Sequence, residues 1–321
     1  MNKKLIEAFG PILLVVISII YTACNNASSS SSKKQLISFK PIQGIHYSEV
    51  QRLQKNGLAL NAYGYQLEPQ WQINFVSDDS ASVYSPIKKQ FLNFPLSRGY
   101  DSVFNTARAW LRVKKMNKDS LVLEILKAKN DSIEINGSKV YMLFYADNYI
   151  KNVLHSDTAT LRRPSRRDTQ FVKSLVIKAN KDITKAFAAR HPVQFISKSP
   201  LVTAKQLRTK PDIMNNFDTA TDYLSPEYDI NIDKAYADFY YSFTACVDDR
   251  GEMHYLRPLI DFSMVGEEAQ KSYIHLSQSV MDSYLKYYFK IIPGTTLGFM
   301  HSSNITLHVQ GKTSARGESK K

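Results

Sequence analysis

Between residues 37 and 150, apolar and polar positions alternate in short runs that are separated by turn residues. In one run, Ile73 and Phe75 alternate with polar neighbours. A period of two places every second side chain on the same side of a strand, so these runs predict antiparallel strands joined by tight turns. Asn136 and Gly137, between two of the runs, form a strong hairpin signal. A meander of this kind buries its apolar side only by closing or stacking, which predicts a β-barrel or a β-sandwich.

A polar connector follows over residues 151–216. It begins with an arginine-rich run, which either contacts anionic membrane or is simply a solvated loop. Apolar residues then recur at four-residue spacing from 171 to 187. This spacing predicts an amphipathic helix over residues 168–190, with Asp168 as its N-cap and an apolar face that covers a sheet. Residues 193–216 carry no pattern that assigns them to an element.

Residues 217–311 form the third predicted unit. Alternation over residues 239–247 and 252–260 predicts a hairpin, residues 270–289 read as a helix, and residues 304–310 alternate again as a last strand. The chain is therefore predicted to be an α+β protein. It has an N-terminal antiparallel β barrel or sandwich, a helical connector and a C-terminal β-β-α-β module.

The C-terminal unit resembles the C-terminal domain of TonB-type energy transducers. Three features carry the resemblance: a strand that ends in Asp-Asp-Arg-Gly at residues 248–251, the helix after it, and the loop with Pro293, Gly294 and Gly298 ahead of the last strand. The resemblance covers residues 236–310. It implies a three-stranded antiparallel sheet, backed by a helix, that pairs at its edge with a short peptide strand of a partner, commonly an outer-membrane receptor. The sequence has no long proline-rich spacer, so we expect a binding or structural use of this fold and not energy transduction.

The first 24 residues have the composition of a secretory signal. Lys3 and Lys4 precede a short apolar run over residues 11–20, and small residues stand directly before Cys24. The apolar run is shorter than the roughly 20 residues that a bilayer-spanning helix needs. The stretch resembles a bacterial lipoprotein signal of the Bacteroidetes type. This resemblance implies that residues 1–23 are a signal peptide and that Cys24 receives the lipid; an uncleaved membrane anchor is the alternative.

The segments at the two ends of the mature chain are polar. Residues 24–36 include five consecutive serines and are predicted to be a flexible tether, and residues 312–321 are predicted to be a disordered tail. The formal net charge is +13 at pH 7, and it is +12 without the signal peptide. A basic surface can bind nucleic acid, anionic lipid or acidic glycans. Export argues against nucleic acid, and the scattered lysines favour an ordinary solvated surface.

No set of residues in the sequence forms a recognisable catalytic motif. The motifs HExxH, paired CxxC, Walker A, GxSxG and GxGxxG do not occur. The seven histidines show no ligand spacing, although His301 and His308 could meet His254 in the fold. Paired acids such as that at Asp248 are typical of turns, and Cys246 lies in a strand-like run where a free cysteine is buried. The sequence therefore assigns no catalytic, cofactor-binding or metal-ligating residue and no cofactor.

We therefore expect a lipid-anchored lipoprotein of the cell outer membrane. No acidic residues directly follow Cys24, which favours the side facing the periplasm. The expected role is a binding or structural module that contacts an envelope protein by strand addition. The β domain either holds an apolar ligand or is filled by its own side chains, as small barrels usually are. The alternative function is an envelope hydrolase acting on glycan or peptide, whose acids or histidines meet only in the fold.

Overall fold

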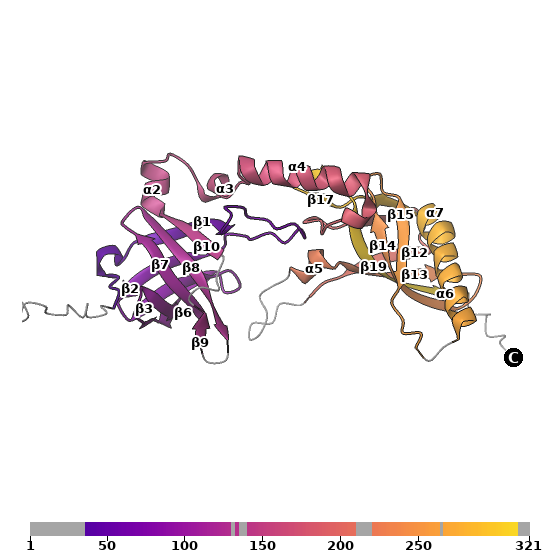
Figure 1. The fold of residues 1–321 in the computed structure, drawn as a ribbon, viewed down its shortest axis with the longest axis horizontal. Coiled ribbons are helices and arrows are strands. Elements are labelled where there is room, and N and C mark those ends of the chain that lie inside the picture. Colours follow the sequence, from indigo (N-terminus) through magenta and orange to yellow (C-terminus); the bar gives the residue numbers. More distant parts are fainter. Residues whose placement is uncertain (1–35, 130–131, 135–139, 210–219, 264–265, 314–321) are drawn as a thin grey trace, which may run out of the picture.

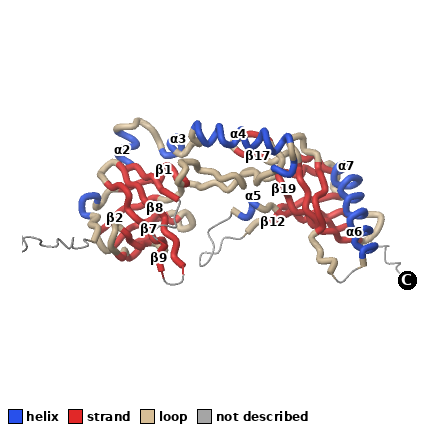
Figure 2. Tube along the Cα trace, viewed as in Figure 1, coloured by secondary structure: helices blue, strands red, loops and turns tan. Residues whose placement is uncertain are grey.

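The computed structural model describes residues 36–129, 132–134, 140–209, 220–263 and 266–313. Two β-rich lobes are joined by helix α4 (Arg166–Lys181), and helices are few (Figures 1 and 2). The predicted signal peptide, Cys24, nearly all of the tether, the turn at Asn136 and Gly137, and the tail from residue 314 lie outside the described residues. Within the described part of the chain, no helix combines the length and apolar character needed to cross a membrane.

The N-terminal lobe is one antiparallel sheet of ten strands. They are β1 (His46–Gln54), β2 (Gln72–Ser77), β3 (Ser80–Ser85), β4 (Gln90–Pro95), β5 (Ser97–Arg98), β6 (Val103–Thr106), β7 (Ala109–Met116), β8 (Ser120–Lys129), β9 (Ser132–Glu134) and β10 (Val140–Ala146). Their order is β4-β3-β2-β1-β10-β8-β7-β6-β5, with β9 paired to β8. Since β4 and β5 lie at opposite ends of this order but are separated only by Leu96, the sheet must curl until its ends meet. The predicted β domain is confirmed as a nearly closed antiparallel barrel.

Polar contacts hold the two ends of the barrel sheet together. The buried Leu96 donates its backbone N–H to the Asp79 carbonyl at 2.9 Å, in the turn between β2 and β3. Arg98 of β5 reaches the same turn, where its Nη1 lies 3.0 Å from Asp78 Oδ2. The other oxygen of Asp78 accepts the backbone N–H of Phe39 at 2.6 Å. One carboxylate therefore ties the segment before β1 and the strand β5 to the β2–β3 turn.

Side chains of the lobe itself fill the barrel. The rings of Phe39 and Phe75 stack at a centroid distance of 4.2 Å, and Phe104 meets them edge-on at 5.0 and 6.0 Å. All three rings are fully buried, together with Ile42 of the short helix η1 (Lys40–Ile42). The same core contains Tyr47, Ile73, Leu111, Leu121, Leu123 and Phe144. Of the two alternatives for the barrel, the described residues favour a packed interior.

The connector contains α2 (Asp147–Asn152), α3 (Thr158–Leu161), α4 and the short helix η2 (Ile183–Lys185). Ser165, not Asp168, is the N-cap of α4. Asp168 is the third helical residue and completes a capping box with Ser165. Its Oδ1 also accepts the backbone N–H of Ala59 at 2.8 Å, so the start of the helix is fixed to the barrel lobe. The helix ends at Lys181 and not at residue 190, because Asp182 leaves the helical conformation and caps η2 instead.

The loop after β1 reaches from the barrel to the C-terminal lobe. Gly64 in this loop has a φ of +89°, and a Cβ there would lie 2.2 Å from the Ala188 carbonyl oxygen, so only glycine fits this approach. Arg190 forms an ion pair with Glu68 and stacks its guanidinium 4.6 Å from the centre of the Tyr223 ring. These contacts connect the two lobes in addition to α4.

The C-terminal lobe is built on a five-stranded sheet of order β12-β13-β19-β14-β15. These strands are β12 (Val202–Leu207), β13 (Glu227–Asp233), β14 (Phe239–Val247), β15 (Met253–Pro258) and β19 (Ser303–Lys312). β13 runs parallel to β19, and the other pairs are antiparallel. Two small sheets pair β11 (Gln194–Ser197) with β16 (Phe289–Ile292) and β17 (Thr295–Thr296) with β18 (Phe299–Met300). Residues 194–207, which the sequence pattern leaves unassigned in the connector, therefore belong to the sheets of this lobe.

One face of this sheet is covered by a helical segment of the chain. It consists of α6 (Glu267–Val280), the π-helical turn η3 (Met281–Leu285) and α7 (Lys286–Tyr288), while α5 (Thr221–Leu224) precedes β13. The segment lies on the side of the sheet that faces away from the barrel (Figure 1). Met281 and Leu285 of the π turn are buried against the sheet, whereas Leu276 of α6 is 38% exposed. The face on the barrel side is not covered by this segment.

Candidate functional site

Polar side chains of three neighbouring strands meet on the face of the C-terminal sheet that α6 does not cover. Ser242 of β14 stands directly opposite His308 of β19 in the strand register, and Glu227 lies one strand further on, in β13. Alternation along a strand sends every second residue to the same face, and Phe243 and Leu307 point to the opposite, helix-covered core. The pairing of distant segments therefore assembles a serine, a histidine and a glutamate.

One hydrogen bond and one longer ion-pair contact link these three groups. Ser242 Oγ lies 2.8 Å from His308 Nδ1, and His308 Nε2 lies 3.5 Å from Glu227 Oε2. A carboxylate only accepts hydrogen bonds, so the imidazole N–H faces Glu227 and Nδ1 accepts the proton of the serine hydroxyl. This order of acid, base and hydroxyl is the one that activates a serine for nucleophilic attack. The backbone N–H of Ser242, however, donates to the Tyr273 hydroxyl at 2.7 Å and is not free to stabilise an oxyanion.

A hollow opens beside this chain of polar groups. It has a volume of about 940 Å³, including solvent-open space. It is lined by Leu224, Ser225, Pro226, Thr244, Leu256, Arg257, Leu259, Asn304, Ile305 and Thr306. Leu256 and Leu259 remain 41% and 38% exposed, although both border the hollow. At the β15 side the lining combines two leucines with Arg257, and along β14 and β19 it is mainly polar, which suits an extended chain with mixed side chains.

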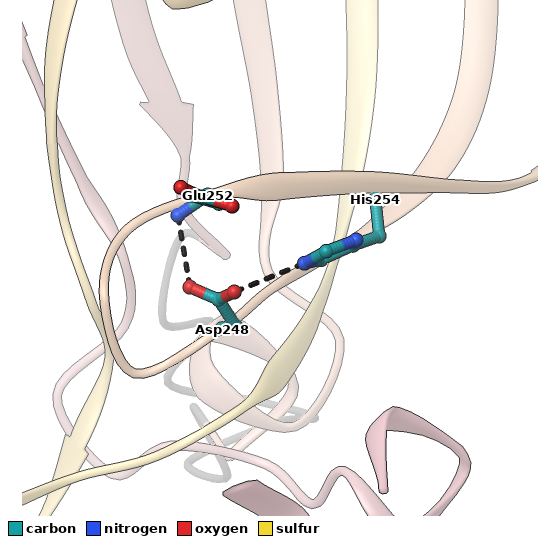
Figure 3. Close-up of side chains that lie close together, drawn as sticks. All are labelled: Asp248, Glu252 and His254. Carbon is teal, nitrogen blue, oxygen red and sulfur yellow. Dashed lines mark hydrogen bonds and ion pairs between the residues drawn. The ribbon is translucent and has the colours of Figure 1, made fainter.

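A second polar cluster lies at the turn between β14 and β15 (Figure 3). His254 Nε2 contacts Asp248 Oδ2 at 3.0 Å, and Glu252 completes a group whose three ligand atoms all lie within 4.8 Å of one another. Asp248 Oδ1 accepts the backbone N–H groups of Arg250 and Glu252, both at 2.9 Å. Burial alone would raise the pKa of Asp248, but the hydrogen bonds from His254 and these two amides lower it below its usual value. The cluster contains the donor types that hold a divalent metal ion.

The residues singled out in the sequence occupy separate places in the structure. Cys246 is fully buried, and burial raises the pKa of its thiol to about 11, so it is inert as a nucleophile. His301 is also fully buried, whereas His308 and His254 belong to the two different clusters described above. Cys24 lies outside the described residues.

The two polar clusters were not predicted from the sequence. The alternation in residues 239–247 and 304–310 places Ser242 and His308 on strands, but only the register brings them opposite each other. Glu227 had no strand assigned to it, although Tyr228, Ile230 and Ile232 alternate with polar residues and this alternation could have predicted β13. For Asp248 and His254 a local signal did exist: both flank a predicted hairpin turn.

Comparisons with known proteins assign no family. No protein-family profile and no curated protein matches the chain. Among solved structures, the chain is similar to the siderocalin Ex-FABP, described as functioning through dual ligand specificities. The identity is 13% and the TM-score 0.21, over 44% of this chain and 84% of that one. At this identity and TM-score the similarity gives no information on function.

Proposed function

We propose that this protein is a lipid-anchored lipoprotein of the outer membrane, facing the periplasm, whose C-terminal lobe binds an extended segment of another envelope protein. The signal-like residues 1–23, the position of Cys24 and the serine-rich tether support the anchoring. The C-terminal lobe has its own core and is joined to the barrel by α4. Because the described residues of the barrel are packed by their own side chains, we assign the binding role to the C-terminal lobe.

The observation that carries the binding role is the free edge of β15 beside the hollow. β15 is an outer strand of the five-stranded sheet, so the backbone groups on its outer side pair with no other strand of the described residues. An extended peptide can add to such an edge through backbone hydrogen bonds and place alternate side chains in adjoining pockets. The exposed Leu256 and Leu259 line the pocket at this position.

The resemblance to the TonB C-terminal domain supports the same proposal. The order β14, β15, α6 and β19 follows the β-β-α-β order of that family, and the Pro293–Gly294 loop precedes the last strand. Two differences set this lobe apart: the sheet has five strands, and β13 pairs in parallel along the outer side of β19. The outer side of β19 is therefore already paired with β13, whereas the outer side of β15 is unpaired among the described residues and can accept a partner strand.

Two experiments test the proposal in parts. Fatty-acid labelling in cells is expected to mark the wild-type chain and not Cys24→Ala; equal labelling of both would contradict the lipid anchor. A photo-crosslinking amino acid at position 256 is expected to capture one extended segment of one envelope protein, identified by mass spectrometry. The matched position Ile87, 52% exposed on the barrel, should not capture that segment. Adducts that are the same at both positions, or scattered over many proteins, would refute binding at β15.

A second candidate function is an envelope hydrolase acting on a peptide or glycan. The Ser242–His308–Glu227 chain favours it, because the histidine is placed to take the serine proton. A fluorophosphonate probe should label the wild-type chain at Ser242, and Ser242→Ala should abolish the labelling. An unlabelled wild type would remove this candidate. Binding is the better supported function, since the Ser242 amide is already hydrogen-bonded to Tyr273.

A further inference from the structure

The turn between β14 and β15 brings one imidazole nitrogen and two carboxylates together from a single hairpin. Asp248, Glu252 and His254 follow one another at spacings of four and two residues, and their ligand atoms lie within 4.8 Å (Figure 3). We infer that these three side chains bind a divalent transition-metal ion of the zinc type. This inference is independent of the proposed lipid anchor and of partner binding at β15.

The backbone of the turn holds the first ligand in place. Asp248 Oδ1 accepts two backbone N–H groups, so the carboxylate cannot rotate freely, and its Oδ2 is directed toward His254 (Figure 3). Gly251 permits this turn with a φ of +85°, and a Cβ there would lie 2.5 Å from the Ile291 carbonyl oxygen. Hydrogen bonds that orient a metal-ligating carboxylate in this way raise the affinity of metal sites. The ligand is therefore held in position before a metal ion arrives.

The distances fit a small ion after a modest adjustment. Metal–ligand bonds of about 2.1 Å in a tetrahedral site place two ligand atoms about 3.4 Å apart. Asp248 Oδ2 and His254 Nε2 are 3.0 Å apart, so they need to separate by only a few tenths of an ångström. All three ligand atoms lie within 4.8 Å of one another, so no pair has to approach by more than about 1.4 Å. Glu252 is exposed and can make this movement without disturbing the core.

The donor set selects the class of metal. One imidazole nitrogen with two carboxylate oxygens suits Zn²⁺ and its transition-metal neighbours. Ca²⁺ and Mg²⁺ prefer sites made of oxygen alone, with six or more ligands. Three protein ligands leave a fourth tetrahedral position for water or for a group from another molecule.

Calorimetric titration of the full chain tests the inference. The protein is purified in detergent, treated with a chelator and titrated with zinc chloride, and separately with calcium chloride. We expect one Zn²⁺ per chain at this site and no Ca²⁺. Loss of an outer-shell partner already costs about 10–100-fold in metal affinity. The double variant Glu252→Gln/His254→Ala, which loses two direct ligands, should therefore bind at least about 100-fold more weakly.

The variants separate loss of the site from loss of the fold. Both substitutions leave Asp248 and the backbone hydrogen bonds of the turn intact, and circular dichroism checks that the chain stays folded. The matched control, Glu268→Gln/His275→Ala, removes an exposed acid and an exposed histidine on α6. It should bind zinc as the wild type does. The inference is overturned if the wild type binds no zinc, or if the two double variants bind it equally.

Discussion

Substitution of His301 by glutamine is expected to abolish much of the acid sensitivity of the C-terminal lobe. His301 is fully buried and stacks on Phe187 at a centroid distance of 3.7 Å. The Ser302 carbonyl oxygen can only accept, so Nδ1 carries the proton and donates to it at 3.0 Å. Nε2 then accepts from the Thr296 hydroxyl at 2.9 Å. Burial therefore lowers the pKa of His301 from 6.5 to about 4, although the hydrogen bond to Ser302 opposes this shift.

The size of the effect follows from this pKa. Between pH 6.5 and about 4 the unfolded chain binds a proton at His301 that the folded chain does not, so the stabilisation is complete above pH 6.5 and is lost as the pH falls toward 4. A shift of this size corresponds to a loss of about 3 kcal/mol in the free energy of unfolding at low pH. Glutamine does not titrate, so in His301→Gln the change in the unfolding free energy of the lobe over the same pH range should be smaller by about 3 kcal/mol.

Urea unfolding at several pH values between 7 and 4.5 measures this difference. Far-UV circular dichroism follows the whole chain, while tryptophan fluorescence follows the barrel alone, because both tryptophans, Trp71 and Trp110, lie in the N-terminal lobe. The exposed His275 provides the control, since His275→Gln should keep the wild-type pH dependence. Equal pH dependence in wild type and His301→Gln would refute the reasoning, whatever the absolute stability of the variant.

Three other predictions address the barrel, the contact between the lobes and the buried thiol. Phe75→Ala should lower the unfolding free energy of the barrel by about 3–5 kcal/mol, and the exposed-site control Phe91→Ala by about 1 kcal/mol or less, as followed by tryptophan fluorescence; similar losses would mean that Phe75 is not in the packed core. Arg190→Ala should weaken the contact between the lobes by about 1–2 kcal/mol, since a partly exposed ion pair and one cation–π contact are lost. It should speed proteolytic cleavage of the loop after β1, and an unchanged cleavage rate would count against this contact. In a Cys24→Ala background, iodoacetamide at pH 8 should modify Cys246 at least about 100-fold more slowly in the native protein than in urea, because burial raises its pKa and blocks access; rapid native labelling would disprove the burial.

The strands of the barrel were predictable because their side chains alternate, but the closure of the barrel was not. The alternation at Ile73 and Phe75 depends only on the two-residue period of a strand, and both side chains are buried as expected. A barrel and a sandwich require the same alternation. The decision between them depends on Leu96 and Arg98, which bring the two ends of the sheet together through contacts with a turn about 20 residues earlier.

The connector shows where local signals compete. Ser165 and Asp168 are both good N-cap residues, and the sequence pattern favoured Asp168 because it stands closest to the apolar spacing. In the structure Ser165 is the N-cap. Asp168 Oδ1 accepts a hydrogen bond from the backbone N–H of Ala59, in the loop after β1. The spacing of the two residues already distinguishes them, because a serine followed three residues later by an acid forms a capping box with the serine as N-cap. β11 and β12 were missed for another reason: they are short and largely exposed, so they lack a clear apolar alternation.

The candidate site was less predictable than the fold, because strand register decides it. Ser242 and His308 are 66 residues apart, and a shift of one residue in the pairing of β14 with β19 would turn one of them toward the core. The cluster of Asp248, Glu252 and His254 depends only on a hairpin, yet its acids look like those of an ordinary turn. Spacing in the sequence could not distinguish a capping carboxylate from a ligand.

The geometry of the C-terminal sheet limits how a partner strand can add to it. Among the described residues, the outer strands of the sheet are β12 and β15, and the outer side of each is unpaired. Lysine on an edge strand discourages pairing with other chains, and β12 carries the exposed Lys205 at its centre. On β15 the pairing register shifts opposite Thr244 and Ala245, and the strand ends at Pro258, which has no backbone N–H to donate. Addition at β15 is thereby restricted to about five residues, so backbone hydrogen bonds alone give a weak complex. The side chains that enter the hollow must then supply most of the specificity, so the position to probe on β15 is Leu256, whose side chain lines the hollow.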